Sequence, residues 1–388
     1  MTRLNRRQFG LAAVGAGLAL ALSGAPGQAA DPPIKVGSFL SYTGPASFLG
    51  DPEKKTIEME IAKINKAGGI NGRKIELIMY DDAGNPERST SFAKRLIEND
   101  KVDVIVGGST TAIVMTVLPL MEQAGMPFFN LSGSVLPIEP VRKWIFKNAH
   151  TDRMSNEKIF AEMKKRGISK IGMISENVGI GKSGHDEALK VKGNYGIDVI
   201  ADEFYNPRDP DMTAQLTRIK NTPGVQAVVV WGFGQSPAIV TKNYRQLGIT
   251  APLYHTHGVA TVEFIRLAGE AAEGVRMSAA GVIVADQLPD SDPQKKTMQE
   301  FIKSYREVYK DDASAYAGYA YDSLHMTLAA IRRAGTTDKA KVRDEIEKTS
   351  GYVGVGGTFH LSPTDHLGID AQALRMVEVK NGKFVLSE

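Results

Sequence analysis

The sequence predicts an α/β protein made of two doubly wound, Rossmann-like lobes. Short apolar runs that end in Gly, Ser or Asp alternate with amphipathic helical segments, as in parallel sheets with crossover helices. This alternation pauses near Ala149 and then starts again. At 388 residues the chain is also too long for one ordinary core, so two domains are expected.

The first half of the chain alternates strands and helices in a regular order. Short apolar runs predict strands over 34–40, 74–80, 102–106 and 126–130. Apolar residues at helical spacing predict helices over about 51–67, 85–99 and 111–123. The glycines of Gly68-Gly-Ile-Asn-Gly72 end the first helix. Right-handed crossovers would wind this β-α-β-α-β-α-β order into one sheet.

The second half repeats the pattern and then becomes mainly helical. Strands are expected over 170–175, 198–204, 227–231 and 253–255. Helices are expected over about 152–166, from a glycine turn to about 194, over 212–220, 237–247 and 261–267, and later over 298–309, 316–333 and 339–348. The final segment reads as a hairpin because Asn381-Gly382 stands between two apolar runs.

Residues 1–30 are predicted to be an export signal that is removed. Asn5-Arg-Arg-Gln-Phe-Gly-Leu11 is a twin-arginine pattern, and an uncharged run leads from it to a small-x-small cleavage site at Gly27-Gln-Ala29. A permanent membrane anchor needs about 18 to 20 strongly apolar residues, and glycines and Ser23 interrupt this run. We therefore expect export by the twin-arginine route, with the general secretory route as the alternative.

The signal also carries the excess positive charge of the chain. It holds Arg3, Arg6 and Arg7 and no acidic residue, so the 47 basic residues fall to 44 in the mature chain, against 44 acidic ones. A nucleic-acid partner thereby loses its electrostatic support. The chain contains no cysteine, so we expect neither disulfides nor a lipid anchor.

The stretch from Val102 to Ser134 is predicted to form an anion-binding edge. Its two strands end in Gly107-Gly-Ser-Thr110 and Leu131-Ser-Gly-Ser134. Such loops offer backbone N–H groups and hydroxyls at the carboxyl edge of the sheet, where open α/β sheets bind ligands. A helix that starts at Thr111 would add the favourable field of its N-terminus. The stretch holds no residue pattern typical of a catalyst, so it indicates recognition of a small anion.

A glycine motif supports an alternative function. Gly179-Ile-Gly-Lys-Ser-Gly184 matches the dinucleotide pattern G-x-G-x-x-G, and Asp202 and Glu203 follow about twenty residues later. On this basis the chain could be an exported NAD(P)-dependent oxidoreductase. We favour a simple strand-to-helix turn, because no acid or base for hydride transfer is apparent around the motif. A P-loop is excluded because Glu176 stands at the first required glycine.

Three further groups have both a functional and a structural interpretation. His255 and His257 lie on one face of a predicted strand and could bind a metal, but without a visible third ligand we expect two histidines that face a cleft. The pair Asp81-Asp82 could be catalytic, and a solvated strand end is the favoured interpretation. Trp231 and Phe233 stand at the carboxyl end of a strand, which favours a pocket over the core.

Several motifs together give the chain a family resemblance. They are Tyr42-Thr-Gly-Pro45, Ala67-Gly-Gly-Ile-Asn-Gly-Arg-Lys-Ile-Glu-Leu77, Asp81-Asp82, Gly107-Gly-Ser-Thr-Thr111 and Ala272-Glu-Gly-Val275. Over nearly all of 34–388 the chain resembles the periplasmic solute-binding proteins of the branched-chain amino acid type, which are soluble receptors of ABC importers. The resemblance implies a type I periplasmic binding protein with a hinge, an N-terminal lobe of 31–149 and 285–355, and a C-terminal lobe of 150–284 and 356–388.

The resemblance also implies which residues of the first lobe hold a ligand. In such receptors a hydroxyl and N–H groups of the first-lobe loops bind the carboxylate, at positions that resemble Thr111 and the run Ser132-Gly133-Ser134. Phe48 and Leu49 resemble the first-turn positions that cover the ligand. No catalytic residue, metal or cofactor is implied.

The second lobe departs from the amino-acid-binding pattern. His257 stands where those members have an acidic residue against the ligand ammonium, and two aromatic positions align with Ile180 and Phe233. Burial of an ammonium group without an anionic partner is costly. We therefore expect a carboxylate with a flat or apolar body, such as benzoate, a hydroxybenzoate or a phenylpropenoid acid. A branched-chain or other amino acid is the alternative.

The expected biological setting follows from the same resemblance. The protein would be a soluble monomer in the periplasm that delivers its ligand to an ABC permease at the inner membrane. It would be a receptor and not an enzyme.

Overall fold

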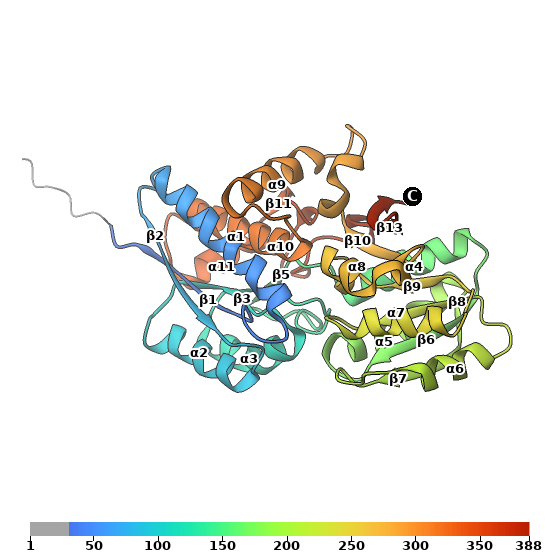
Figure 1. Ribbon diagram of the computed structural model, residues 1–388. Helices are drawn as coiled ribbons and strands as arrows, with labels where there is room; N and C mark the ends of the chain where they lie inside the picture. Colours follow the sequence, from blue (N-terminus) through green and yellow to red (C-terminus); the bar gives the residue numbers. More distant parts are fainter. Residues whose placement is uncertain (1–30, 388) are drawn as a thin grey trace, which may run out of the picture. The chain divides into compact units, whose positions relative to one another are not determined.

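The computed structural model describes residues 31–387, so the predicted export signal and its cleavage site lie outside the described residues. From Pro32 onward the chain forms one compact unit. In this unit two large β-sheets are each flanked by helices (Figure 1). The predicted α/β class with two doubly wound sheets is confirmed.

The first sheet has five parallel strands in the order β2-β1-β3-β4-β5. The strands are β1 (Ile34–Leu40), β2 (Ile75–Asp81), β3 (Val104–Gly107), β4 (Phe128–Asn130) and β5 (Ile145–Lys147). Their burial is nearly continuous from β3 to β5, as expected for strands that are covered on both faces.

Two hydrophobic cores cover the two faces of the first sheet. Helices α2 (Pro86–Glu98) and α3 (Thr111–Ala124) pack on one face. Helix α1 (Ser47–Lys66) packs on the other, together with helices from much later in the chain. Those are α9 (Lys295–Tyr309), α10 (Ala315–Ala334) and α11 (Lys339–Glu347). We refer to this sheet and its helices as the first lobe.

The second sheet has the order β14-β13-β10-β9-β8-β6-β7. Its strands are β6 (Lys170–Glu176), β7 (Asp198–Tyr205), β8 (Ala227–Trp231), β9 (Leu253–His255), β10 (Arg276–Ala280), β13 (Leu374–Lys380) and β14 (Lys383–Leu386). The strands from β6 to β10 are parallel to one another, whereas β13 and β14 are antiparallel additions at one edge.

The helices of the second lobe also cover both faces of their sheet. One core contains α4 (Asp152–Lys165) and α5 (Gly179–Val191), and the other contains α6 (Thr213–Asn221), α7 (Ser236–Gln246) and α8 (Val262–Ala268). A two-stranded sheet joins β11 (Ser350–Val353) to β12 (Thr358–His360). Short 3₁₀ helices are η1 (Lys192–Tyr195), η2 (His257–Val259), η3 (Gly269–Ala272), η4 (Gly281–Gln287) and η5 (Ala371–Ala373).

The order of elements makes the chain pass between the two large sheets after β5, after β10 and before β13. Figure 1 shows the consequence, since α9, α10 and α11 lie with the first sheet although they follow nearly all of the second. Among the described residues, no helix is both long and apolar enough to span a bilayer.

Most predicted elements are present, and the differences have physical reasons. The hairpin at Asn381-Gly382 is confirmed, and both residues have the positive φ that a tight turn requires. Helix α1 starts at Ser47, earlier than the predicted Asp51. The strands β5, β10, β11 and β12 were not predicted. They are three to five residues long, which is too short for periodicity to distinguish them from loops.

Candidate ligand-binding cleft

The carboxyl ends of β3 and β4 meet in the two loops that the sequence predicts to bind an anion. A side chain at Gly107 would collide with the Phe39 carbonyl, and Gly108 has a φ of +76°, so both positions need glycine. Thr110 then caps α3, because its Oγ1 accepts a hydrogen bond from Ile113 N at 3.4 Å. The remaining N–H groups of the first helical turn, those of Thr111 and Ala112, have no acceptor within the helix, and they are available to a ligand.

A cavity of about 230 Å³ lies beside these loops. Six of the nine predicted ligand-binding residues line it, from both lobes: Leu49, Thr111, Gly133, Ile180, Phe233 and His257. Further lining residues include Pro45, Leu131, Tyr316 and Tyr319. None of the described residues that line the cavity is acidic. The wall is therefore apolar and aromatic, with a few neutral polar groups.

The other three predicted residues lie next to the cavity but do not line it. Phe48 borders a larger neighbouring hollow, and its ring lies 6.0 Å from that of Phe233 across the cleft. The buried Ser132 Oγ donates to Asn130 Oδ1 at 2.8 Å. Ser134 Oγ lies 2.7 Å from Ser183 Oγ of the second lobe. In this state the two serine hydroxyls hold the loop and the interlobe contact, and their role with a ligand stays a prediction.

Two buried polar atoms in the cavity wall have no hydrogen-bond partner within residues 31–387. They are Thr111 Oγ1, in the first turn of α3, and His257 Nδ1. Both residues are only 6% exposed. Buried polar atoms are normally satisfied, so these two are candidates for contacts with a ligand. Burial lowers the pKa of His257 to about 3, which keeps its imidazole neutral.

A buried lysine lies behind the carboxylate loop. Lys147, at the end of β5, is fully buried and its Nζ donates to the Ser132 carbonyl. Burial lowers the pKa of Lys147 to about 7, and the charge of Asp152 opposes this shift. The lysine thus fixes the backbone of the loop whose residues Leu131 and Gly133 line the cavity. Nothing in the sequence pattern around Ile145 signals this role.

Two tyrosines of α10 were missed as cavity residues. Tyr316 and Tyr319 line the cavity, and they are three residues apart, so they share one face of the helix. The Tyr316 hydroxyl donates to the Gly258 carbonyl at 2.8 Å, and Tyr319 Oη lies 2.9 Å from His150 Nδ1. Their spacing in the sequence signals a shared face but not the surface that it meets.

The two histidines at and after the end of β9 point to different places. His255 Nε2 lies 2.9 Å from Thr241 Oγ1 and its ring packs on Phe264 in the second-lobe core. His257 alone of the pair lines the cavity. The expectation that both would face the cleft is therefore wrong for His255. In residues 31–387 no group of three or more His, Asp or Glu side chains is arranged to hold a metal.

The glycine motif of α5 serves close packing. A Cβ at Gly184 would lie 2.3 Å from ring atoms of Trp231, and one at Gly181 would lie 2.3 Å from the Glu176 carbonyl oxygen. The glycines therefore allow α5 to pack closely on its sheet. The motif lies within α5 and not in the turn before it, so the interpretation as a strand-to-helix turn is wrong for its position. Trp231 is fully buried and donates to Asn156 Oδ1 at 3.1 Å. The predicted pocket position is thus wrong for Trp231, whereas Phe233 does line the cavity.

The acidic pair at the end of β2 stabilises the turn that follows β1. Asp82 Oδ1 accepts from Ser41 Oγ at 2.6 Å and from Gly84 N at 2.8 Å. Asp81 Oδ1 accepts from Ala83 N at 3.0 Å. Because Asp82 is fully buried, the interpretation as a solvated strand end is wrong for this residue.

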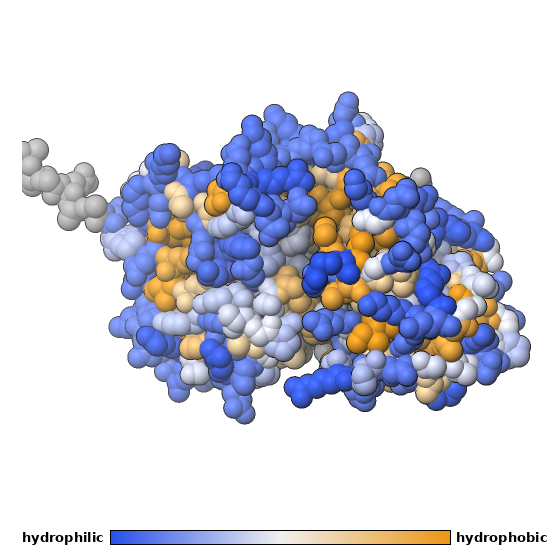
Figure 2. Space-filling model, in the orientation of Figure 1, coloured by the Kyte–Doolittle hydropathy of each residue, from blue (hydrophilic) through white to orange (hydrophobic). Residues whose placement is uncertain are grey.

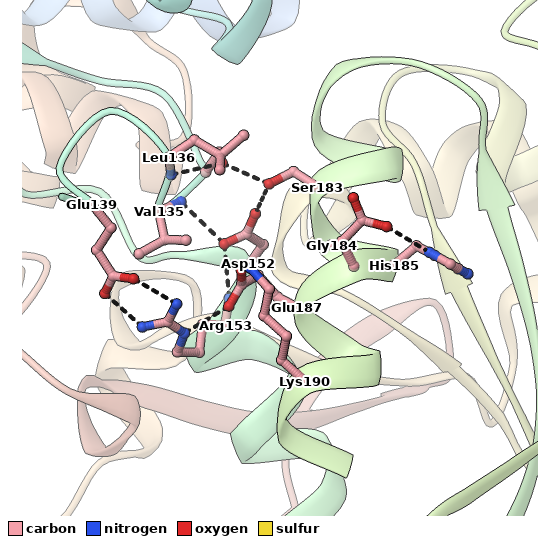
Figure 3. A network of polar contacts seen from close by, with 12 residues as sticks. Val135, Leu136, Glu139, Asp152, Arg153, Ser183, Gly184, His185, Glu187 and Lys190 are labelled. Atoms are coloured by element: carbon pink, nitrogen blue, oxygen red, sulfur yellow. Dashed lines mark hydrogen bonds and ion pairs between the residues drawn. The ribbon is translucent and has the colours of Figure 1, made fainter.

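A polar network joins the two lobes where the chain first crosses between them (Figure 3). Asp152 begins α4 and accepts a hydrogen bond from Ser183 Oγ of α5. Its neighbour Arg153 pairs with Glu187 of α5 at 2.7 Å and with Glu139 of the first lobe at 2.5 Å. The crossing segment is thereby anchored on both sides, next to the Ser134–Ser183 contact.

A larger hollow of about 800 Å³ lies next to the cavity and is bordered by α8 and α9 residues such as Val262, Leu267 and Ile302. Figure 2 shows hydrophobic residues on this face of the molecule, and Val262 is 64% exposed. Of the predicted ligand-binding residues only Phe48 borders this hollow. We therefore place the candidate site in the smaller cavity.

Comparison with known proteins agrees with this geometry. Residues 33–383 match the family model described as periplasmic binding protein. The chain is 27% identical, over 359 residues, to the leucine-, isoleucine-, valine-, threonine- and alanine-binding protein of Pseudomonas aeruginosa, which covers 92% of the chain and 89% of the relative. It is 26% identical over 309 residues to Leu/Ile/Val-binding protein homolog 3 of Brucella melitensis, and this match covers 79% of the chain and 80% of that relative.

Solved structures show the same two-lobed architecture. An extracellular ligand-binding receptor from Rhodopseudomonas palustris HaA2 superposes with a TM-score of 0.84 at 27% identity, over 92% of the chain and 99% of the receptor. The branched-chain amino acid substrate-binding protein LivJ from Streptococcus pneumoniae, solved with isoleucine, superposes with a TM-score of 0.80 at 24% identity. This match covers 92% of the chain and 99% of LivJ. The relatives are named as binding proteins and not as enzymes.

Proposed function

The chain belongs to the periplasmic binding protein family, and from that premise we propose that it captures a small carboxylate for an ABC importer. The observation that carries this proposal is the buried, unpartnered Thr111 Oγ1 in the first turn of α3, inside an otherwise apolar cavity. A helix N-terminus with free N–H groups and a hydroxyl binds an anion without a buried positive charge. Gly133 in the neighbouring loop leaves room for the carboxylate.

We propose an aromatic acid of the benzoate, hydroxybenzoate or phenylpropenoid type as the ligand. Ile180 and Phe233 from the second lobe would cover a flat body, and Leu49 would close the first-lobe side. The described lining contains no acidic side chain against an ammonium group, which disfavours an α-amino acid because an unpaired buried charge is costly. The names of the relatives support a branched-chain amino acid as the competing candidate.

The buried carboxyl groups nearest to the cavity do not change this argument. Glu53 accepts from Ser109 Oγ at 2.5 Å, and Glu176 accepts from Ser236 Oγ at 2.8 Å. Burial raises the pKa of Glu53 well above its usual range and that of Glu176 to about 7. Glu53 thus favours the neutral form, and Glu176 is about half neutral near pH 7. Neither group lines the cavity.

We further propose that the lobes close on the ligand about a hinge at the crossing segments. The N-terminal lobe would comprise 31–149 and 285–355, and the C-terminal lobe 150–284 and 356–388. Phe359 and Leu361 pack in the first-lobe core, which supports an alternative in which the last crossing follows β12. Closure would be stabilised by the Tyr316–Gly258 hydrogen bond and the Phe48–Phe233 contact.

The cellular setting is part of the same proposal. Residues 1–30 would export the chain to the periplasm by the twin-arginine route, and the mature monomer would deliver its ligand to an inner-membrane permease. Neither a cofactor nor a catalytic step is proposed.

Titration calorimetry of the mature protein tests this function. The probes are benzoate, 4-hydroxybenzoate, 4-hydroxycinnamate and leucine. We expect at least one aromatic acid to bind with a dissociation constant of about 10 μM or lower, and at least about tenfold more tightly than leucine. Tight leucine binding without heat from the aromatic acids would overturn the aromatic class, and no heat from any of the four would overturn the carboxylate site.

A further inference from the structure

The hydroxyl proton of Tyr316 already takes part in a hydrogen bond within the protein. This side chain lines the cavity, and its hydroxyl lies 2.8 Å from the Gly258 carbonyl oxygen. A carbonyl oxygen can only accept, so the hydroxyl must donate there. The phenolic oxygen of Tyr316 therefore has only lone pairs left for a ligand.

The hydroxyl proton of Tyr319 takes part in a hydrogen bond with His150. His150 Nε2 lies 2.7 Å from the Gly356 carbonyl oxygen and therefore carries the ring proton. Burial lowers the pKa of His150 to about 3, so the ring is neutral and has a single N–H. Nδ1 must then accept from the Tyr319 hydroxyl at 2.9 Å. The oxygen of Tyr319 is likewise left with lone pairs alone.

His257 offers a third acceptor. Its Nδ1 is buried and has no partner in residues 31–387. Burial lowers the pKa of His257 to about 3, so the ring is neutral and has a single N–H. We assign that proton to Nε2, which leaves the unpartnered Nδ1 as a bare acceptor.

We propose that Tyr316 Oη, Tyr319 Oη and His257 Nδ1 select a ligand that carries a neutral hydrogen-bond donor, such as a phenolic hydroxyl, in addition to its carboxylate. This inference rests on the proposed function and narrows its ligand class from aromatic acids to hydroxylated aromatic acids. The same acceptors repel a second anionic group. His150 is a positioning residue, since its tautomer sets the direction of the Tyr319 hydroxyl.

Matched ligands test whether the cavity selects a ligand with a hydrogen-bond donor. Calorimetry compares benzoate with 3- and 4-hydroxybenzoate, with the methoxy analogues, which keep the oxygen but lose the proton, and with terephthalate, which adds a second anion. We expect the better hydroxybenzoate to bind at least about tenfold more tightly than benzoate and than its own methoxy analogue, as for a buried hydrogen bond. Terephthalate should bind more weakly than benzoate.

Variants assign the effect to the tyrosines. In Tyr316→Phe and Tyr319→Phe the ratio of hydroxybenzoate affinity to benzoate affinity should shrink toward one, even where loss of the Tyr316–Gly258 hydrogen bond weakens the binding of both ligands. Benzoate binding itself shows that each variant is folded. Tyr321→Phe, on the same helix but outside the cavity lining, is the control and should keep the full advantage.

Failure of this inference can be separated from failure of the proposed function. Equal affinities for benzoate and both hydroxybenzoates, or an advantage that survives in both tyrosine variants, would overturn the donor selection while the carboxylate site stands. If leucine binds more tightly than every aromatic acid, a charged ammonium takes the place of the neutral donor, and both the aromatic ligand class and this inference are overturned.

Discussion

At the scale of single residues, Thr111 is the side chain on which carboxylate binding depends most directly. Its Oγ1 is buried and has no hydrogen-bond partner among residues 31–387, so a ligand carboxylate would gain a charge-assisted hydrogen bond there. Thr111→Ala should weaken the binding of benzoate-type acids by roughly 1 to 3 kcal/mol, measured by calorimetry.

The control for this prediction lies on the same helix. Thr116 Oγ1 donates to the Ala112 carbonyl at 2.8 Å on the exposed face of α3, and Thr116→Ala should leave the affinity unchanged. An unchanged affinity in Thr111→Ala would mean that the carboxylate is held elsewhere.

The raised pKa of Glu176 predicts that the stability of the protein depends on pH. Burial raises its pKa from 4.5 to about 7, so the folded state favours the protonated carboxyl. The stability that this group contributes is present below about pH 4.5 and is lost as the pH rises through 7. From pH 5 to pH 8 the free energy of unfolding of the native protein should fall as Glu176 ionises. The Glu176→Gln variant cannot ionise at this position, so its free energy of unfolding should fall by less, and the difference should be up to about 3 kcal/mol.

Urea unfolding at the two pH values measures this difference. Asp322 and Lys147 also have pKa values near 7, but they titrate in both proteins and cancel in the comparison. Glu98→Gln at an exposed position of α2 is the control and should follow the native curve. If Glu176→Gln also follows the native curve, Glu176 is ionised without penalty in the folded protein.

Part of the cavity could be predicted from local sequence and part could not. Thr111 and Gly133 could be predicted because the strand-loop-helix order places them at the sheet edge. Tyr316 and Tyr319 were not, because α10 reaches the cavity only through a crossing that brings it back to the first lobe. The pair His255 and His257 was misjudged, since η2 starts at His257 and turns that side chain away from the strand periodicity.

At the scale of elements, the packing of α5 against β8 is the most sensitive contact. A Cβ at Gly184 would lie 2.3 Å from the Trp231 ring, which is fully buried and cannot move away. Gly184→Ala should therefore lower the free energy of unfolding by about 1 to 3 kcal/mol, as measured by chemical denaturation.

A glycine on the adjacent 3₁₀ helix is the matched control. A Cβ at Gly193 meets no atom within 4 Å, so Gly193→Ala should change the stability by less than about 0.5 kcal/mol. Equal stabilities of the two variants would contradict the packing role assigned to the glycine motif.

Elements with long periodic patterns were predictable, whereas several of the short strands were not. The helices α9, α10 and α11 and the β13–β14 hairpin lie within a few residues of their predicted positions. Strand β5 is three residues long, and its identity comes from pairing with β4 and not from its own sequence pattern. The antiparallel place of β13 beside β10 likewise depends on contacts that no local signal reports.

At the scale of the whole molecule, lobe closure should depend on Gly133. An ideal Cβ there lies 3.3 Å from His257 Nε2 and from Ile180 Cδ1 of the other lobe, so a branched side chain would hold the lobes apart. Gly133→Val should keep the larger radius of gyration in small-angle scattering when 4-hydroxybenzoate is added, whereas the native protein should contract. Gly193→Val should contract like the native protein, and contraction of Gly133→Val would contradict this role.

The central claim is that the cavity between the lobes holds a carboxylate at the start of α3 and a donor group at the tyrosines and His257. A crystal structure of the mature protein with 4-hydroxybenzoate tests it most directly. We predict a carboxylate oxygen about 2.7 Å from Thr111 Oγ1 and the phenolic oxygen within about 3 Å of Tyr316 Oη, Tyr319 Oη or His257 Nδ1. A ligand bound outside this cavity, or bound in it with the carboxylate turned toward the tyrosines, would contradict the claim.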